Sequence, residues 1–228
     1  MEMDSLQELY VDELKDLYSA ETQIQKALPR MIKAATHPEL KELFTTHLEQ
    51  TERQAERLAR ICEGLGEKPT GKKCVGMAGL LEEAKELMQE KPAREVLDAG
   101  LIGKQQHVEH YEMAGYGCVR TYARLLGREE DVALLEQTLE EERTTDRLLT
   151  ELAERTINVQ AAQADGEQGD EDEGAAPPAR RASKGAAKRP AAKGATKGAT
   201  KGATKGAAKG ATKGAAKGAA KRAVAKRR

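Results

Sequence analysis

The chain has 228 residues, and its 38 basic and 38 acidic side chains give a formal net charge of zero. The two signs are segregated: 17 Lys and Arg but no acid lie in residues 180–228, and residues 1–164 carry 21 bases, 32 acids and a net charge of −11. No apolar run reaches the roughly 18 residues of a membrane helix, and the acidic start lacks a signal-peptide pattern. We therefore expect a cytoplasmic protein without membrane association.

The first 160 residues have the periodicity of an all-α domain. Apolar residues recur every 3.6 positions among Leu, Glu, Ala, Lys and Arg. Helices are predicted over residues 4–35, with a bend at Pro29, then from Pro38 to about 64, 77–90, 93–126 and 128–159. Four long helices and one short helix with brief connections predict an antiparallel four-helix bundle with an additional short helix.

The composition changes after Gln160. Residues 161–179 form an acidic linker with Pro and Gly, and residues 180–228 contain a repeated KGA[AT] unit. A glycine in each four-residue unit costs a helix about 1 kcal/mol relative to alanine. We predict a bundle in 1–160, a disordered linker in 161–179 and a disordered basic tail in 180–228.

Several polar residues interrupt the apolar faces of the helices. Glu21 lies in the stripe formed by Leu14, Leu17, Ile24 and Leu28. A single carboxylate of this kind is more often part of an ion pair, here with Arg143 or Arg147, than a metal ligand. Several buried carboxylates together would repel one another, and a bound cation removes that cost. The candidate metal ligands are Glu21, His47, Gln50, Gln54, Glu109, Glu112, Glu142 and Asp146.

Oxygen ligands with an imidazole suit Fe or Mn better than Zn, so we expect two Fe per chain, or Mn. Tyr18, Gln105 and Tyr116 are candidates to hydrogen-bond these ligands. Amphipathic packing in the core accounts for the two tyrosines equally well.

The segments "DELKDLYSAE", "HLEQTERQAERL", "VEHYEMAGYG" and "TLEEERTTD" resemble the YciF/YciE stress-protein family of ferritin-like domains, over about residues 4–158. The resemblance implies a ferritin-like bundle, a homodimer and a di-iron site that oxidises Fe(II) or consumes peroxide. It makes Glu21, Glu109, Glu112, Glu142 and Asp146 ligands. The chain departs from the family at Gln50, where a Glu is frequent, and it lacks Glu-x-x-His pairs.

The basic tail resembles the lysine- and alanine-rich tails of linker histones. Its cations can neutralise phosphates, but without aromatic residues it cannot stack on bases. We expect sequence-independent DNA binding and association with the nucleoid; contact with an acidic protein, or simple solubilisation, is the alternative. The candidate DNA-binding residues are Arg180, Arg181, Lys184, Lys188, Arg189, Lys193, Lys197, Lys201, Lys205, Lys209, Lys213, Lys217, Lys221, Arg222, Lys226, Arg227 and Arg228.

Two functions from different classes follow. In the first, a metal-dependent redox protein is held on DNA by its tail. In the second, a non-enzymatic protein compacts DNA, and the bundle serves only to dimerise two tails. The three cysteines form no C-x-x-C motif; we expect Cys62 and Cys118 to be buried, and Cys74 to be exposed with a lowered pKa.

Overall fold

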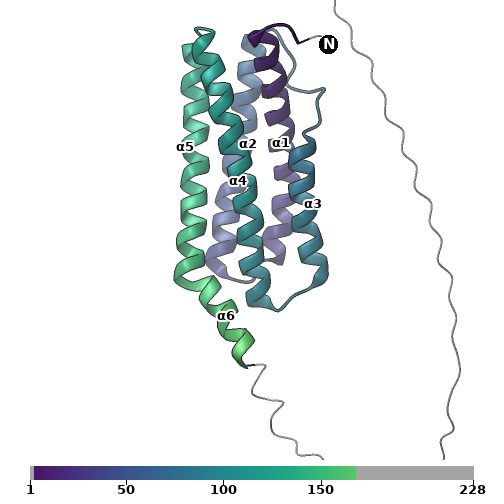
Figure 1. Ribbon diagram of the computed structural model, residues 1–228, viewed down its shortest axis with the longest axis vertical. Helices are drawn as coiled ribbons and strands as arrows, with labels where there is room; N and C mark the ends of the chain where they lie inside the picture. Colours follow the sequence, from purple (N-terminus) through teal and green to yellow (C-terminus); the bar gives the residue numbers. More distant parts are fainter. Residues whose placement is uncertain (1–2, 168–228) are drawn as a thin grey trace, which may run out of the picture. The chain divides into compact units, whose positions relative to one another are not determined.

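The computed structural model describes residues 3–167, and every regular element in this range is helical. The helices are α1 (Leu6–Ala34), α2 (Pro38–Gly64), α3 (Val75–Glu90), α4 (Arg94–Leu125) and α5 (Glu129–Leu152), followed by a π-helical segment (Ala153–Ile157) and α6 (Asn158–Glu167) (Figure 1). The predicted all-α class and its five helices are confirmed. Among these residues, none of the helices combines the length and apolar character needed to cross a bilayer.

The last predicted helix differs from the observed one. A π-helical segment separates α5 from α6, and α6 continues to Glu167, beyond the boundary expected at residue 160. Ala161, Ala162 and Ala164 favour helix, which accounts for the continuation into the predicted linker. The basic tail lies outside the described residues.

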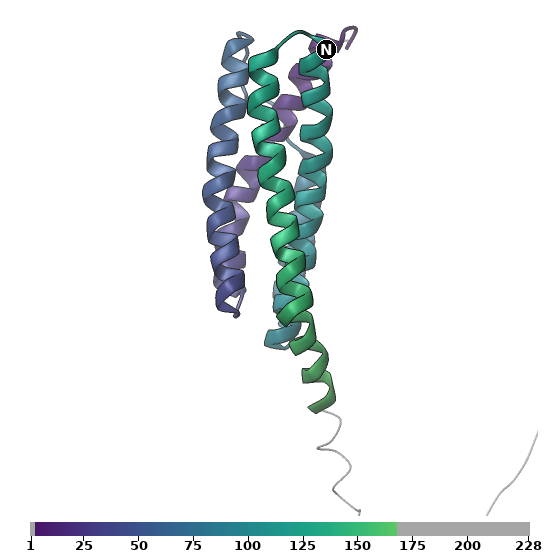
Figure 2. The same cartoon turned by 90° about the vertical axis from the view of Figure 1, so that its left-hand side faces the viewer.

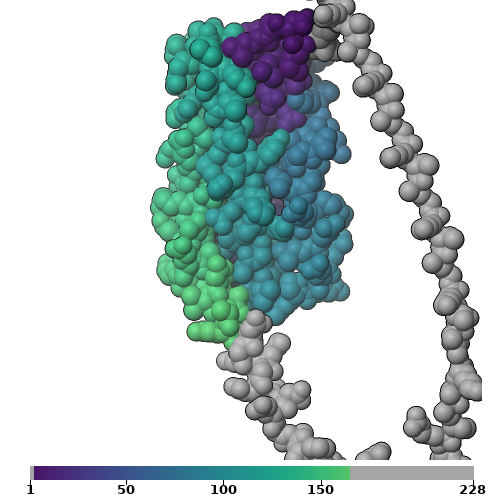
Figure 3. All heavy atoms as spheres, in the orientation of Figure 1, coloured from purple at the N-terminus to yellow at the C-terminus, as the bar shows by residue number. Residues whose placement is uncertain are grey.

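The order of the helices creates one long crossover. α1 and α2 form one antiparallel hairpin, α4 and α5 form another, and α2 runs in the same direction as α4 (Figures 1 and 2). The chain must therefore return along the bundle between α2 and α4, and α3 lies in this connection, packed on α1 and α4. A four-helix bundle with one crossover is the ferritin-like arrangement. In the space-filling view, α3, α4 and α5 cover most of the face turned to the viewer (Figure 3).

The core is divided into two apolar clusters. One includes Ile24, Leu28 and Phe44, and the other includes Leu14, Leu58 and Leu135. Buried polar residues occur in the same helices, on the faces that carry these apolar residues: Glu21, His47, Thr51, Gln54, Gln105, Glu109, Glu112, Thr138, Glu142 and Thr145.

Close packing of α1 on α4 requires a glycine. A Cβ atom at Gly115 would lie 2.7 Å from Cδ2 of Leu17, so a larger residue would displace that side chain. Gly127 has a different role: its φ of +71° closes α4, and the Arg128 N–H donates to the Ala123 carbonyl at 2.9 Å. This is the hydrogen bond of a Schellman C-cap.

The start of α2 is capped by a residue from another helix. His37, at the N-cap position, makes no capping bond with its side chain. Asp98 of α4 instead accepts hydrogen bonds from the backbone N–H of Thr36 at 2.7 Å, the backbone N–H of His37 at 2.9 Å and the Thr36 hydroxyl at 2.6 Å. Asp98 is buried, and it ties the α1–α2 connection to α4.

We expect Asp98→Ala to lower the free energy of unfolding by about 2–3 kcal/mol, because it leaves these donors without a charged acceptor. Thr36→Val removes only the hydroxyl, so its loss should be about 1 kcal/mol. Urea denaturation followed by circular dichroism measures both values. Equal losses for the two variants would contradict the role of Asp98 as a cap.

Candidate metal centre

Four buried side chains form a compact group at the centre of the bundle. We call His47, Glu109, Glu112 and Glu142 the His–Glu cluster; each offers a ligand atom, and these atoms all lie within 4.8 Å of one another. Each side chain is at most 1% exposed. His47 comes from α2, Glu142 from α5 and the other two from α4, and Nε2 of His47 lies 3.3 Å from Oε1 of Glu109.

Helical spacing places these residues. Glu109 and Glu112 are three positions apart on α4, so they occupy one face, which also carries Val108 and Val119. Glu142 lies on the α5 face that includes the buried Leu139, three positions away. The apolar residues on each face turn it toward the core and bring the polar residues with them.

Glu21 adjoins the cluster from α1. It is 0% exposed, its carboxyl group and that of Glu112 influence each other's pKa, and its Oε1 accepts a hydrogen bond from the Tyr116 hydroxyl. Gln105 is also buried, and its Nε2 donates to Oε1 of Glu109 at 2.8 Å. Two of the three residues expected to support the ligands therefore contact carboxylates of this layer.

The two glutamines of α2 lie on the α5 side of the cluster. Gln54 is fully buried, and its Nε2 donates to Oε1 of Glu142 and to Oε2 of Glu141 at 3.1 Å. Gln50 is partly buried, and its Oε1 accepts a hydrogen bond from the Thr145 hydroxyl at 3.4 Å.

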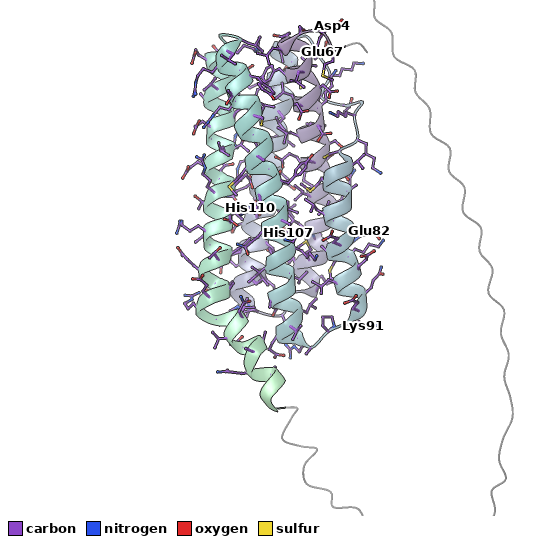
Figure 4. The ribbon with its side chains drawn as sticks, viewed as in Figure 1. Asp4, Glu67, Glu82, Lys91, His107 and His110 are labelled. Carbon is purple, nitrogen blue, oxygen red and sulfur yellow. The ribbon has the colours of Figure 1, made fainter. Side chains whose placement is uncertain are left out.

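Two predicted site residues lie away from the cluster. Asp146 is 23% exposed and accepts a hydrogen bond from Gln106 at 3.0 Å, and Nε2 of His110 lies 3.4 Å from its Oδ1. His110, on α4, is an exposed residue (Figure 4). Four residues rotate a helix by about 400°, so Asp146 is turned about 40° from Glu142, toward the α4–α5 surface. Tyr18 packs beside the apolar cluster that contains Leu14.

Burial sets the protonation of the cluster. Desolvation raises the pKa of Glu21, Glu109 and Glu112 well above the usual range, and the neighbouring charge of Glu142 adds to each shift. Desolvation lowers the pKa of His47, which favours the neutral imidazole. Without a cation, Glu21, Glu109, Glu112 and His47 therefore favour their neutral forms, because charged groups at these positions would be dehydrated and the carboxylates would repel one another.

Many polar atoms of the His–Glu cluster and of the buried Glu21, Gln54 and Gln105 beside it have no hydrogen-bond partner within the protein. They are Oε2 of Glu21, both ring nitrogens of His47, Oε1 of Gln54, Oε1 of Gln105, Oε2 of Glu109, both carboxyl oxygens of Glu112 and Oε2 of Glu142. Buried polar atoms are normally satisfied, so this concentration is exceptional. A set of carboxylate oxygens and one imidazole fits a divalent cation such as Fe²⁺ or Mn²⁺.

The cysteines differ from expectation in two cases. Cys74 was expected to be exposed, but it is buried, with only 1% of its surface accessible. Its side chain caps the start of α3, and burial raises the pKa of its thiol. Cys118 is exposed rather than buried, whereas Cys62 is buried as predicted. The basic residues next to Cys74 suggested an open loop, but the Tyr111 hydroxyl lies 2.9 Å from its Sγ and covers it.

The sequence did not single out Glu141 or Arg57. Arg57 of α2 donates to both carboxyl oxygens of Glu141, at 2.7 Å each, and to the Thr138 hydroxyl at 3.0 Å. This ion pair lies next to Gln54 and Glu142, at the surface between α2 and α5. The spacing within each helix carries no signal for a pair formed between helices.

Comparison with known proteins places the chain in a family. The family described as domain of unknown function DUF892 matches residues 5–162. Protein YciF of Escherichia coli K12 is 41% identical over 162 residues, which are 71% of this chain and 98% of YciF. The crystal structure of the E. coli stress protein YciF aligns with a TM-score of 0.66 over 68% of this chain and 99% of that chain, at 41% identity. YcfI of Rhodopseudomonas palustris aligns with a TM-score of 0.63 at 40% identity, over 66% of this chain and 97% of that one. The chain therefore belongs to the DUF892 family, together with the stress protein YciF.

Proposed function

We propose that the bundle binds two divalent metal ions, iron or manganese, and uses them to oxidise Fe(II) or consume peroxide. The observation that carries this proposal is the set of buried ligand atoms without partners, drawn from α1, α2, α4 and α5. The His–Glu cluster supplies enough ligand atoms for one ion, and Glu21, beside Glu112, adds a carboxylate for a second. When bound, iron would supply one-electron redox chemistry with oxygen or peroxide.

The protein residues have distinct roles in this proposal. His47 is neutral at physiological pH, so its free ring nitrogen can bind a cation without first losing a proton. The Tyr116 hydroxyl orients Glu21, and Gln105 orients Glu109. The apolar residues of the core exclude bulk water, which strengthens every electrostatic contact of the layer.

The tail extends the proposal to DNA. Its 17 cations and lack of acids favour contact with phosphates, independently of base sequence. A metal centre attached to such a tail would remove iron or peroxide close to DNA, where hydroxyl radicals would do damage. The alternative is a nucleoid-associated protein that compacts DNA and in which the bundle only dimerises; a centre that binds no metal would favour it.

Metal binding is tested first. Full-length protein prepared without chelators should contain about two Fe or Mn per chain by elemental analysis, and metal at 100 times the Kd should stabilise it by about 2.7 kcal/mol for each bound ion. Glu112→Gln/Glu142→Gln should lose the metal. Asp146→Asn is the matched control and should retain it, since Asp146 lies outside the cluster. An empty wild type after anaerobic Fe(II) addition would refute the enzymatic proposal.

The metal-free protein should be stabilised by Glu112→Gln. Carboxyl groups whose pKa is raised by folding contribute most stability at low pH and lose it as pH rises toward the folded-state pKa. An uncharged Gln at position 112 avoids that loss. Glu112→Gln should therefore raise the free energy of unfolding by about 1–3 kcal/mol at pH 8, and by less at pH 5. Urea titrations with EDTA measure both values, and a gain that shrinks as pH rises would contradict the prediction.

Binding to DNA should depend steeply on salt. If about 8–12 tail cations engage phosphates, log K should fall with log salt at a slope of roughly −7 to −11. Fluorescence anisotropy with two unrelated duplexes measures the slope and should give the same affinity for both. A chain ended after Glu167, which keeps α6, should lose the binding; retained affinity would place the DNA contact on the bundle.

A further inference from the structure

The His–Glu cluster is fully buried, so a cation can reach it only between helices. Two partly buried side chains contact the cluster or its immediate neighbours, and both lie between α2 and α5. Gln50 of α2 accepts a hydrogen bond from the Thr145 hydroxyl of α5 at 3.4 Å, three residues from Glu142. Glu141 is 20% exposed and shares the Gln54 amide with Glu142.

Two other pairs of neighbouring helices, α4–α5 and α1–α2, offer no comparable connection among residues 3–167. Between α4 and α5, Asp146 is bonded to Gln106 and lies beside His110, both at the surface. Between α1 and α2, Gln25 donates to the Thr51 carbonyl at 3.3 Å and does not bond to the cluster. Between α2 and α5, by contrast, the Gln54 amide donates both to Glu142 of the cluster and to the partly exposed Glu141. These hydrogen bonds connect the cluster to a carboxylate that solvent reaches.

From these contacts we propose that divalent cations reach the metal centre between α2 and α5, and that Glu141 is an outer carboxylate which passes the cation to Glu142. Gln54 lies between the two carboxylates, and its fully buried Oε1 has no protein partner, so it is free to contact a cation in transit. Arg57 neutralises Glu141 when no cation is present. The inference rests on the proposed metal binding of the cluster.

The ion pair between Arg57 and Glu141 predicts opposite effects of two substitutions on the rate of metal loading. The Arg57 guanidinium donates to both carboxyl oxygens of Glu141, at 2.7 Å each, in a two-point ion pair. An arriving cation must compete with the guanidinium for the two carboxyl oxygens. Removal of Glu141 should therefore slow metal loading, whereas removal of Arg57 should accelerate it.

The test is stopped-flow loading of metal-free, full-length protein with Co(II), followed by its absorption, and release of the metal into EDTA. Glu141→Gln should slow loading about tenfold and slow release by a similar factor, with unchanged stoichiometry. Arg57→Gln should accelerate loading about threefold. Asp146→Asn removes the same charge at similar exposure between α4 and α5, and its rates should stay within about twofold of wild type.

Each other outcome overturns the inference. If Glu141→Gln slows loading but accelerates release, Glu141 attracts the bound ion rather than lining its route. Equal slowing by Asp146→Asn would indicate a general charge effect, and unchanged rates in Glu141→Gln and Arg57→Gln would place the route elsewhere. A wild type that takes up no Co(II), Fe(II) or Mn(II) would refute the proposed function itself. Thermal melts by circular dichroism establish that each variant is folded.

Discussion

The burial of Glu21, Glu109, Glu112 and Glu142 in one layer is the constraint on which the rest of the structure depends. Carboxylates in an apolar interior are costly when charged, and neighbouring charges increase the cost. The protein can reduce it by keeping protons on the carboxyl groups or by binding a cation. Raised pKa values express the first solution, and the unpaired oxygen atoms favour the second.

The bundle must supply stability elsewhere to tolerate such a layer. Two apolar clusters, built from all four long helices, provide most of the buried hydrophobic surface. The connections add directed contacts, of which the capping of α2 by Asp98 is the clearest. Functional sites commonly lower the stability of the protein when their ligand is absent. Ligand binding then raises the free energy of unfolding again.

The seam between α2 and α5 differs from the apolar interior. Gln54 and Arg57 of α2 contact Glu141 of α5 there, and Thr145 of α5 donates to Gln50 of α2, all beside the buried His–Glu cluster. On the entry route that we propose, the same seam both holds α2 against α5 and admits a cation.

The sequence by itself determined the five helices α1 to α5 and the inward direction of Glu21, Glu112 and Glu142, because a 3.6-residue period fixes which side chains share a helix face. Only the tertiary structure decided that Asp146 turns outward, although it shares a face with Glu142 to within about 40°. It also decided that Cys74 is covered and that Arg57 pairs with Glu141. These features depend on which helices are neighbours and how each is rotated, and packing across the whole bundle sets both.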